Sequence, residues 1–201
     1  MTEASRLALE RLRSTEHFEW YVVNLVAGVF YIYASAIRRK AWGDVYLAIA
    51  FSSLELIWEM ANALVLHFTD RAALWTVAGK SSYVIYVGLN LEIALMFAVM
   101  PLVLFALIDG LGKSYLVPAL LGVFCVAVEC ILNQWGALAW FWPFWRWPFV
   151  ALIVVVYAGP LMALAWARAH LSERDKRRLA VAAPVAAVAL HCFFALYLHW
   201  I

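Results

Sequence analysis

The chain has 201 residues, of which 67% are hydrophobic and 14% are charged, and its formal net charge is +2. Soluble domains are nearer half apolar, so this composition excludes an ordinary soluble domain. The small net charge provides no basic surface, and no nucleic-acid partner is expected. Three cysteines without a CxxC pair indicate neither a disulfide framework nor a zinc site. The lipid bilayer is therefore the first expected partner.

Residues 1–18 form a charged leader ahead of the apolar region. Leucines and arginines are interleaved in this leader, a pattern that fits a short amphipathic helix on the membrane surface or a simple solvated leader. Residues 19–201 are expected to form one transmembrane domain.

Six apolar runs are long enough to cross a membrane, because about 20 helical residues span the hydrocarbon layer. In chain order they are Trp20–Ile37, Val45–Phe68, Tyr83–Ile108, Tyr115–Trp140, Pro148–Ala167 and Leu179–Trp200. A seventh span would have to lie in Ala72–Gly79 or in the leader. The predicted fold is thus an all-α bundle of six or seven transmembrane helices.

Positive charge is concentrated in the links after the first, third and fifth spans. These links contain Arg38, Arg39, Lys40, Lys113, Arg174, Lys176, Arg177 and Arg178, whereas Arg71, Lys80 and Arg146 are on the other side. Lys and Arg collect in cytoplasmic loops. We therefore expect loops 1, 3 and 5 in the cytoplasm and both termini outside, in a bacterial inner membrane.

The second span carries a polar seam. Glu55, Glu59 and Asn62 lie within about 60° of one another on a helical wheel. Lipid offers such groups no partner, so this face should point into the bundle.

Other spans contribute polar groups as well. They are Asn90 and Glu92 in the third span, Glu129 and Asn133 in the fourth, and His191 in the middle of the sixth. No Lys or Arg lies at matching depth, and a charged carboxylate at mid-bilayer costs about 3 kcal/mol. Some of these acids must therefore be protonated, bind a cation or line a wet cavity, unless they only hydrogen-bond the helices together.

Tryptophans crowd the boundary between the fourth and fifth spans. Trp140, Trp142, Trp145 and Trp147 fit an interfacial aromatic belt. They also fit a pocket lining, in which aromatic faces stabilise a cation.

Three functions fit intramembrane acids. An enzyme could use a neutral buried Glu as a Brønsted acid on a prenyl chain, with aromatic rings guiding the resulting cation. A di-metal carboxylate enzyme, such as an oxygenase or hydratase of lipids or carotenoids, could take its imidazoles from His67 and His191, although the Glu-x-x-His spacing is absent. A small proton-coupled carrier could use the acids as a relay, although the two halves show no duplication.

Two stretches carry a resemblance to a known family. "SLELIWEMANALVLHFT" and "VGLNLEIALMF" resemble the integral-membrane terpene cyclases of meroterpenoid and indole-diterpene pathways, over Val22–Phe97. The matching features are the Trp58-Glu59 pair in the second span and Asn90 in the third. The later stretch "VECILNQWGALAWFW" loosely resembles membrane carotenoid-modifying proteins, which also act on polyprenyl hydrocarbons.

The resemblance implies a non-metal, cofactor-free cyclase that acts on a farnesyl- or geranylgeranyl-bearing substrate. Glu59 would then be the proton donor. The chain departs from the family in two ways, because the family has seven helices and a functional Asp in the last one. Here six spans are counted, and His191 occupies the comparable region.

The expected catalytic residues are Glu59, Glu55, Glu129 and His191, with Glu55 holding Glu59 and sharing its proton. Substrate binding is expected from Asn62, Asn90, Glu92, Asn133, Trp58, Trp135 and Tyr157. No metal or other cofactor is expected.

Overall fold

The computed structural model describes residues 1–79, 81, 83–112, 115–146 and 148–201. In chain order the elements are α1 (Glu3–Glu10), α2 (Tyr21–Arg38), α3 (Trp42–Thr69), β1 (Trp75–Val77), β2 (Val84–Tyr86), β3 (Leu89–Asn90), α4 (Leu91–Leu111), α5 (Leu116–Gln134), β4 (Leu138–Trp140), α6 (Val150–His170), α7 (Glu173–His191) and a π-helical end (Cys192–Tyr197). Within these residues, six helices, α2 to α7, are long and apolar enough to span a membrane. The predicted all-α membrane bundle is confirmed.

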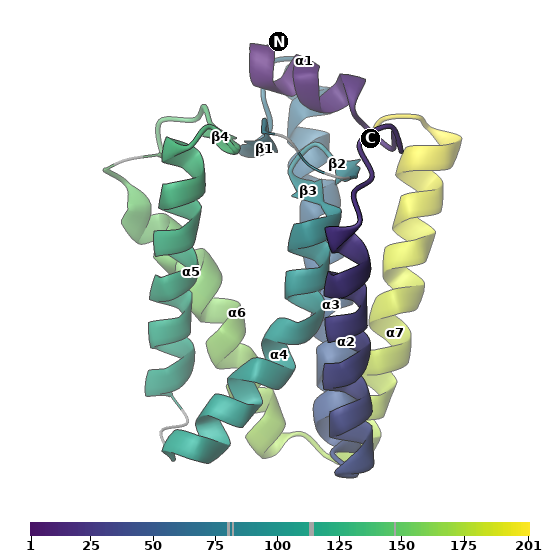
Figure 1. Ribbon diagram of the computed structural model, residues 1–201, viewed down its shortest axis with the longest axis vertical. Coiled ribbons are helices and arrows are strands. Elements are labelled where there is room, and N and C mark those ends of the chain that lie inside the picture. Colours follow the sequence, from purple (N-terminus) through teal and green to yellow (C-terminus); the bar gives the residue numbers. More distant parts are fainter. Residues whose placement is uncertain (80, 82, 113–114, 147) are drawn as a thin grey trace.

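The N-terminal helix α1 lies across the end of the bundle that holds both chain termini and the four strands (Figure 1). Its Ala8 side chain is buried. Backbone bonds hold this leader to the loops after α3, from Thr2 N to Arg71 O at 2.9 Å and from Arg13 N to Val84 O at 2.8 Å. The leader is therefore docked on the protein as well as being amphipathic.

Short strands at this end join loops that are far apart in the sequence. β1 follows α3 and pairs antiparallel with β4, which follows α5, so that Trp75 lies opposite Trp140. β2 and β3 form a hairpin directly before α4. Residues 72–79 thus contain a strand and not a seventh span. These strands were not predicted, because each has only two or three residues and carries too little pattern for recognition.

Three predicted helix boundaries were wrong by six residues or more. α4 begins at Leu91 and not at Tyr83, because Asn90 caps it by accepting a hydrogen bond from Ile93 N at 2.9 Å. α5 ends at Gln134, six residues before the predicted Trp140. α7 begins at Glu173, where the Ser172 hydroxyl accepts a hydrogen bond from Asp175 N at 3.2 Å.

The six spans pack as two groups. α5 packs mainly against α6, whereas α3 packs mainly against α7 and α4, with α2 beside α4 (Figure 1). Gly122 allows α5 to approach α6 closely, since a Cβ at this position would lie 2.7 Å from the Ala158 Cα. Contacts between the two groups are sparser than those within them.

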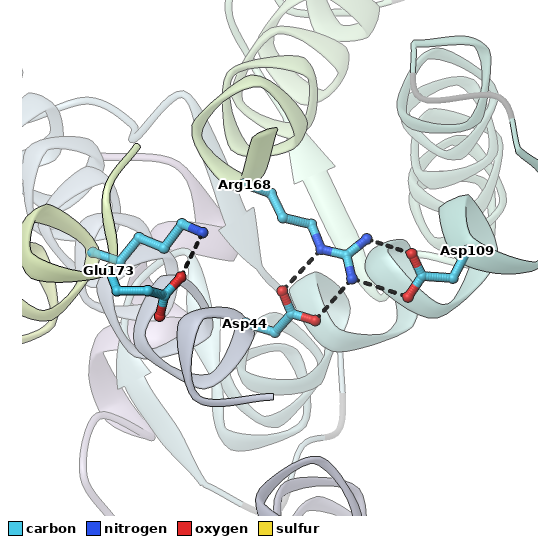
Figure 2. A network of polar contacts seen from close by, with 5 residues as sticks. Asp44, Asp109, Arg168 and Glu173 are labelled. Carbon is cyan, nitrogen blue, oxygen red and sulfur yellow. Dashed lines mark hydrogen bonds and ion pairs between the residues drawn. The ribbon is translucent and has the colours of Figure 1, made fainter. Parts of the chain in front are cut away.

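Arg168 connects the two groups at the end away from the strands. Its guanidinium, on α6, forms forked pairs with Asp44 on α3 and with Asp109 on α4 (Figure 2). The shortest contacts are 2.8 Å to Asp44 and 2.7 Å to Asp109. Forked Arg–carboxylate pairs are geometrically specific. The groups are thus tied at one end by Arg168 and at the other by the β1–β4 pair.

Candidate functional site

A cavity of about 550 Å³ lies between the two ties. Its walls come mainly from α3 and α6. α4 contributes two residues, and α5, α7, β1 and the link between β4 and α6 contribute one each. The polar and indole-bearing residues of its lining are Glu55, Glu59, Glu129, Trp58, Trp75, Trp145 and Tyr157. The volume falls in the range of about 300–1,000 Å³ that is usual for small-molecule sites.

The cavity is long and has two unlike ends. α3 lines it from Leu47 to Glu59, which covers about 18 Å of helix at 1.5 Å per residue. Glu59 and Glu129 lie toward the strand end, and the opposite end is apolar, with Leu47, Leu164 and Leu179. Such a space suits a long apolar molecule with its reactive or polar end at the acids.

The cavity is accessible from the side. Leu54 and Trp58 line it, yet their residues are 55% and 43% exposed. Both lie in the middle of α3, at the depth that the hydrocarbon layer of a bilayer would occupy.

Glu59 is held in place by Trp75. The Glu59 residue is 3% exposed, and the Trp75 indole Nε1 donates to its Oε1 at 3.2 Å and its Oε2 at 3.1 Å. Asn62, one turn further along α3, fixes the Trp75 backbone. Its Nδ2 donates to Trp75 O at 2.9 Å, and its Oδ1 accepts from Leu74 N at 2.8 Å.

The backbone of Gly88 packs directly against the Glu59–Trp75–Asn62 cluster. A Cβ built on Gly88 would lie 2.7 Å from Trp75 Nε1 and 2.8 Å from Glu59 Oε2 and would overlap the Asn62 amide. The hairpin between β2 and β3 thus closes over the Glu59 carboxyl, and any side chain at Gly88 would displace it.

Glu129 brings a second acid from α5 to the same cavity. Its residue is 6% exposed, and its Oε1 accepts a hydrogen bond from Trp140 Nε1 at 2.9 Å. The other oxygen, Oε2, is buried and has no hydrogen-bond partner among the described residues. Trp145 Nε1 is likewise buried without a partner there. Trp145 and Tyr157 line the same cavity as Glu129.

Five predicted residues meet in this cavity. They are Glu55, Glu59, Glu129, Trp58 and Tyr157, and they come from α3, α5 and α6. The convergence of acids from separate spans is the arrangement that the sequence analysis expected. Their catalytic and binding roles stay predictions.

Asn62 and Asn90 are used by the backbone and not by the cavity. Asn62 holds the loop that carries Trp75, and Asn90 caps α4. Neither belongs to the cavity lining found among the described residues. Substrate binding by these two amides is therefore not what the geometry favours.

Glu92 lies elsewhere too, which corrects its expected depth in the third span. Because α4 begins at Leu91, Glu92 is in the first helical turn. Its carboxyl accepts hydrogen bonds from the Tyr21 hydroxyl and, at 3.0 Å, from the Ser81 hydroxyl. An acidic side chain in the first helical turn also interacts favourably with the positive end of the helix dipole.

Asn133, Trp135 and His191 lie outside the described cavity lining, which corrects the expectation that they complete the pocket. Asn133 Nδ2 donates to Leu138 O at 3.0 Å and so shapes the turn into β4. Trp135 is 79% exposed at the end of α5.

His191 lies near the strand end of its span and not in the middle, because α7 begins earlier than expected. Its Nδ1 is 2.6 Å from the hydroxyl of Tyr86, on β2. Burial raises the pKa of Tyr86 to about 12, with Arg13 acting in the opposite direction. This pair fastens the hairpin to α7.

The metal alternative lacks a clustered donor set. Among the residues that the structure describes, no three His, Cys, Asp or Glu side chains are grouped so that they could hold a metal ion. The two histidines considered as ligands are engaged elsewhere, since His67 stacks on Trp200 with ring centroids 4.8 Å apart and His191 contacts Tyr86.

Sequence reasoning missed Trp75 and Gly88 and left Trp145 between two interpretations. Trp75 lies between the second and third predicted spans, where the structure has β1. Among the clustered tryptophans, Trp145 lines the cavity, and Trp142 Nε1 instead donates to the carbonyls of Ala72 and Ala73. Trp147, Lys80 and Lys113 lie outside the described residues. The cytoplasmic location of loops 1, 3 and 5, predicted from the basic links, stays a prediction.

Comparison with known proteins places residues 2–197 in a family described as an uncharacterized membrane protein family. A protein of Archaeoglobus fulgidus, described as an uncharacterized protein, is 36% identical over 173 residues, which is 82% of each chain. This relative is archaeal, so the likeness does not tie the chain to a bacterial membrane. No solved structure matches the chain significantly.

Proposed function

We propose that this chain, which belongs to an uncharacterized family of integral, multi-pass membrane proteins, is an enzyme that isomerises an isoprenoid lipid by acid catalysis. The observation that carries the proposal is the convergence of Glu55, Glu59 and Glu129 in one apolar cavity.

The first step requires a neutral acid beside an apolar substrate. No Lys or Arg side chain belongs to the described cavity lining, so three charged carboxylates would be uncompensated there. At least one of them therefore holds a proton. Glu59 is the best donor, because it is buried and Trp75 fixes its orientation. It protonates an alkene carbon or an epoxide oxygen, and a carbocation forms on the substrate.

The aromatic lining stabilises this cation. Trp58, Trp75 and Trp145 form a continuous run, with ring centroids 6.1 Å apart for the first pair and 5.1 Å for the second. The faces of indole rings attract cations within about 6 Å. The run leads from the lateral opening toward the acids, so a cation can migrate along the substrate without meeting water.

The reaction ends when the substrate cation loses a proton to the protein. Glu129 accepts a proton from a carbon next to the cation, and that C–H electron pair forms the new double bond. The proton then passes from Glu129 to Glu59 within the cavity, which restores the starting state. Product and substrate have the same atoms, so no oxidant, reductant or cofactor is consumed. The terpene cyclase resemblance of residues 22–97 supports this reaction class.

Incubation of the purified protein with isoprenoid probes tests the proposal. Geranylgeraniol, squalene and a terminal prenyl epoxide, supplied in lipid nanodiscs, should give at least one product of unchanged mass. A mass increase by water would indicate a hydratase, and an increase by oxygen together with about two bound metal ions would indicate the di-metal alternative.

Proton flux provides the other test. If folded protein returns all probes unchanged and carries a proton current in liposomes, the carrier alternative replaces the enzyme. The enzyme proposal expects no such current above that of Glu59→Gln.

A further inference from the structure

Two buried polar atoms at the strand end of the cavity have no partner. They are Glu129 Oε2 and Trp145 Nε1, and both residues line the cavity with exposures of 6% and 4%. Thr76 Oγ1, which is also unpartnered among the described residues, lies on β1 and does not belong to the cavity lining. Unsatisfied buried groups are uncommon in native proteins and require an explanation.

The two atoms have complementary needs. An indole Nε1 can only donate a hydrogen bond, and a carboxylate oxygen accepts one. Both residues line the same cavity, so one small group bound between them could reach both. A hydroxyl is the simplest group that accepts from one side and donates to the other. An ether or epoxide oxygen accepts only and would leave Glu129 Oε2 unsatisfied.

We infer that Glu129 and Trp145 form a hydroxyl-binding subsite, so the ligand of this cavity is an isoprenoid alcohol whose oxygen lies at the strand end. The inference rests on the proposed function for its choice of an isoprenoid. Trp145 Nε1 donates to the hydroxyl oxygen, and the hydroxyl donates to Glu129 Oε2. The apolar chain then extends along α3, past Glu55, toward Leu47.

The position of the subsite also limits the chemistry at Glu59. A hydroxyl held at Glu129 fixes one end of the chain, so the double bond that Glu59 reaches must lie near that end. Glu129 is then a substrate-positioning group as well as the proton acceptor, and the tail only has to fill apolar space.

Binding to three matched probes tests the subsite without turnover. The probes are geranylgeraniol, its methyl ether and the corresponding hydrocarbon, each competed against radiolabelled geranylgeraniol on the whole protein in nanodiscs. The ether keeps the acceptor oxygen but loses the donor. Tighter binding of the alcohol than of the ether therefore reports the hydrogen bond to Glu129. Tighter binding of the ether than of the hydrocarbon reports the hydrogen bond from Trp145. Each preference should be about tenfold, the size expected for one hydrogen bond.

Two variants assign these preferences to residues. Trp145→Phe should remove the ether-over-hydrocarbon preference, and Glu129→Met should remove the alcohol-over-ether preference. Trp142→Phe is the matched control, because it removes an indole N–H that bonds to the carbonyls of Ala72 and Ala73 outside the cavity. If Glu129→Met does not fold, the effect of Trp145→Phe on the ether-over-hydrocarbon preference alone tests the subsite.

The outcomes separate this inference from the proposed function. Equal binding of all three probes by the native protein overturns the hydroxyl subsite, even if isomerisation is observed. Selective alcohol binding without any isomeric product keeps the subsite and removes the proposed reaction.

Discussion

The indole of Trp75 donates one N–H to both carboxyl oxygens of Glu59, at 3.2 and 3.1 Å. The two residues come from different elements, β1 and α3, so this bond couples the strand-end loop to the acid in the cavity. A donor shared between both oxygens fixes the plane of the carboxyl and hence the direction in which its proton points.

Trp75→Phe keeps an aromatic ring, although a smaller one, and removes that donor. We expect the isomerisation rate to fall by about 10- to 100-fold, because a misplaced catalytic acid costs rate more than binding. Because Trp75 is a buried core residue, the smaller ring should also lower the thermal unfolding midpoint, so rates are compared at a temperature at which the variant is folded. Rates measured beside Trp142→Phe, which removes an indole N–H away from the cavity, provide the control. Equal rates in the two variants would show that Trp75 does not orient Glu59.

Gly88→Ala should destabilise the protein. The added methyl group would overlap the Glu59–Trp75–Asn62 cluster, and overpacking of this kind costs about 1–3 kcal/mol. Gly28→Ala is the matched control, because a Cβ at Gly28 meets nothing within 4 Å. Thermal unfolding in the same detergent compares the two. An unchanged thermal unfolding midpoint for Gly88→Ala would mean that the hairpin is not packed closely against the Glu59–Trp75–Asn62 cluster.

Arg168→Lys should weaken the tie between the two helix groups. Lysine keeps the charge but loses the fork that pairs Arg168 with Asp44 and Asp109, so we expect a loss of about 1–3 kcal/mol in unfolding free energy. Arg178→Lys, at an exposed pair with Asp175, should cost almost nothing. Equal midpoints for both variants would argue that the Arg168 network adds no stability.

Alkaline pH should loosen the strand-end hairpin through Tyr86. Its pKa is raised to about 12 by burial, above the ordinary value of about 10. The folded state therefore keeps the phenol proton longer than the unfolded state does. Stability should be independent of Tyr86 below about pH 10 and should fall as the pH rises toward 12. The unfolding midpoint should depend less on pH across this range in Tyr86→Phe than in the native protein. Identical pH profiles for the two proteins would contradict the assignment of this effect to Tyr86.

The number of spans and the polar seam of α3 could be predicted from the sequence, because both depend on local hydropathy and helical period. Glu55 and Glu59 needed only the spacing of one helix to be assigned to an inward face. Glu129 was found because an acid within an apolar run has few structural explanations.

Tertiary pairing was beyond sequence reasoning. The strand of Trp75 exists only because β4 lies beside it, and neither strand has enough residues for a recognisable pattern. The depth of Glu92 was misjudged because the apolar run continues through a hairpin before α4 begins. Arg168, Asp44 and Asp109 are ordinary charges at helix ends in sequence, and only the packing of three helices joins them.

Turnover by Glu59→Gln tests the central claim most directly. Glutamine keeps the shape and hydrogen-bonding capacity of the side chain but has no acidic proton. With an isoprenoid that the native protein isomerises, we predict a loss of about 10²- to 10⁴-fold in rate, with unfolding midpoint and probe binding preserved. Glu92→Gln, an acid outside the described cavity lining, should retain the native rate. Near-native turnover by Glu59→Gln would contradict the account.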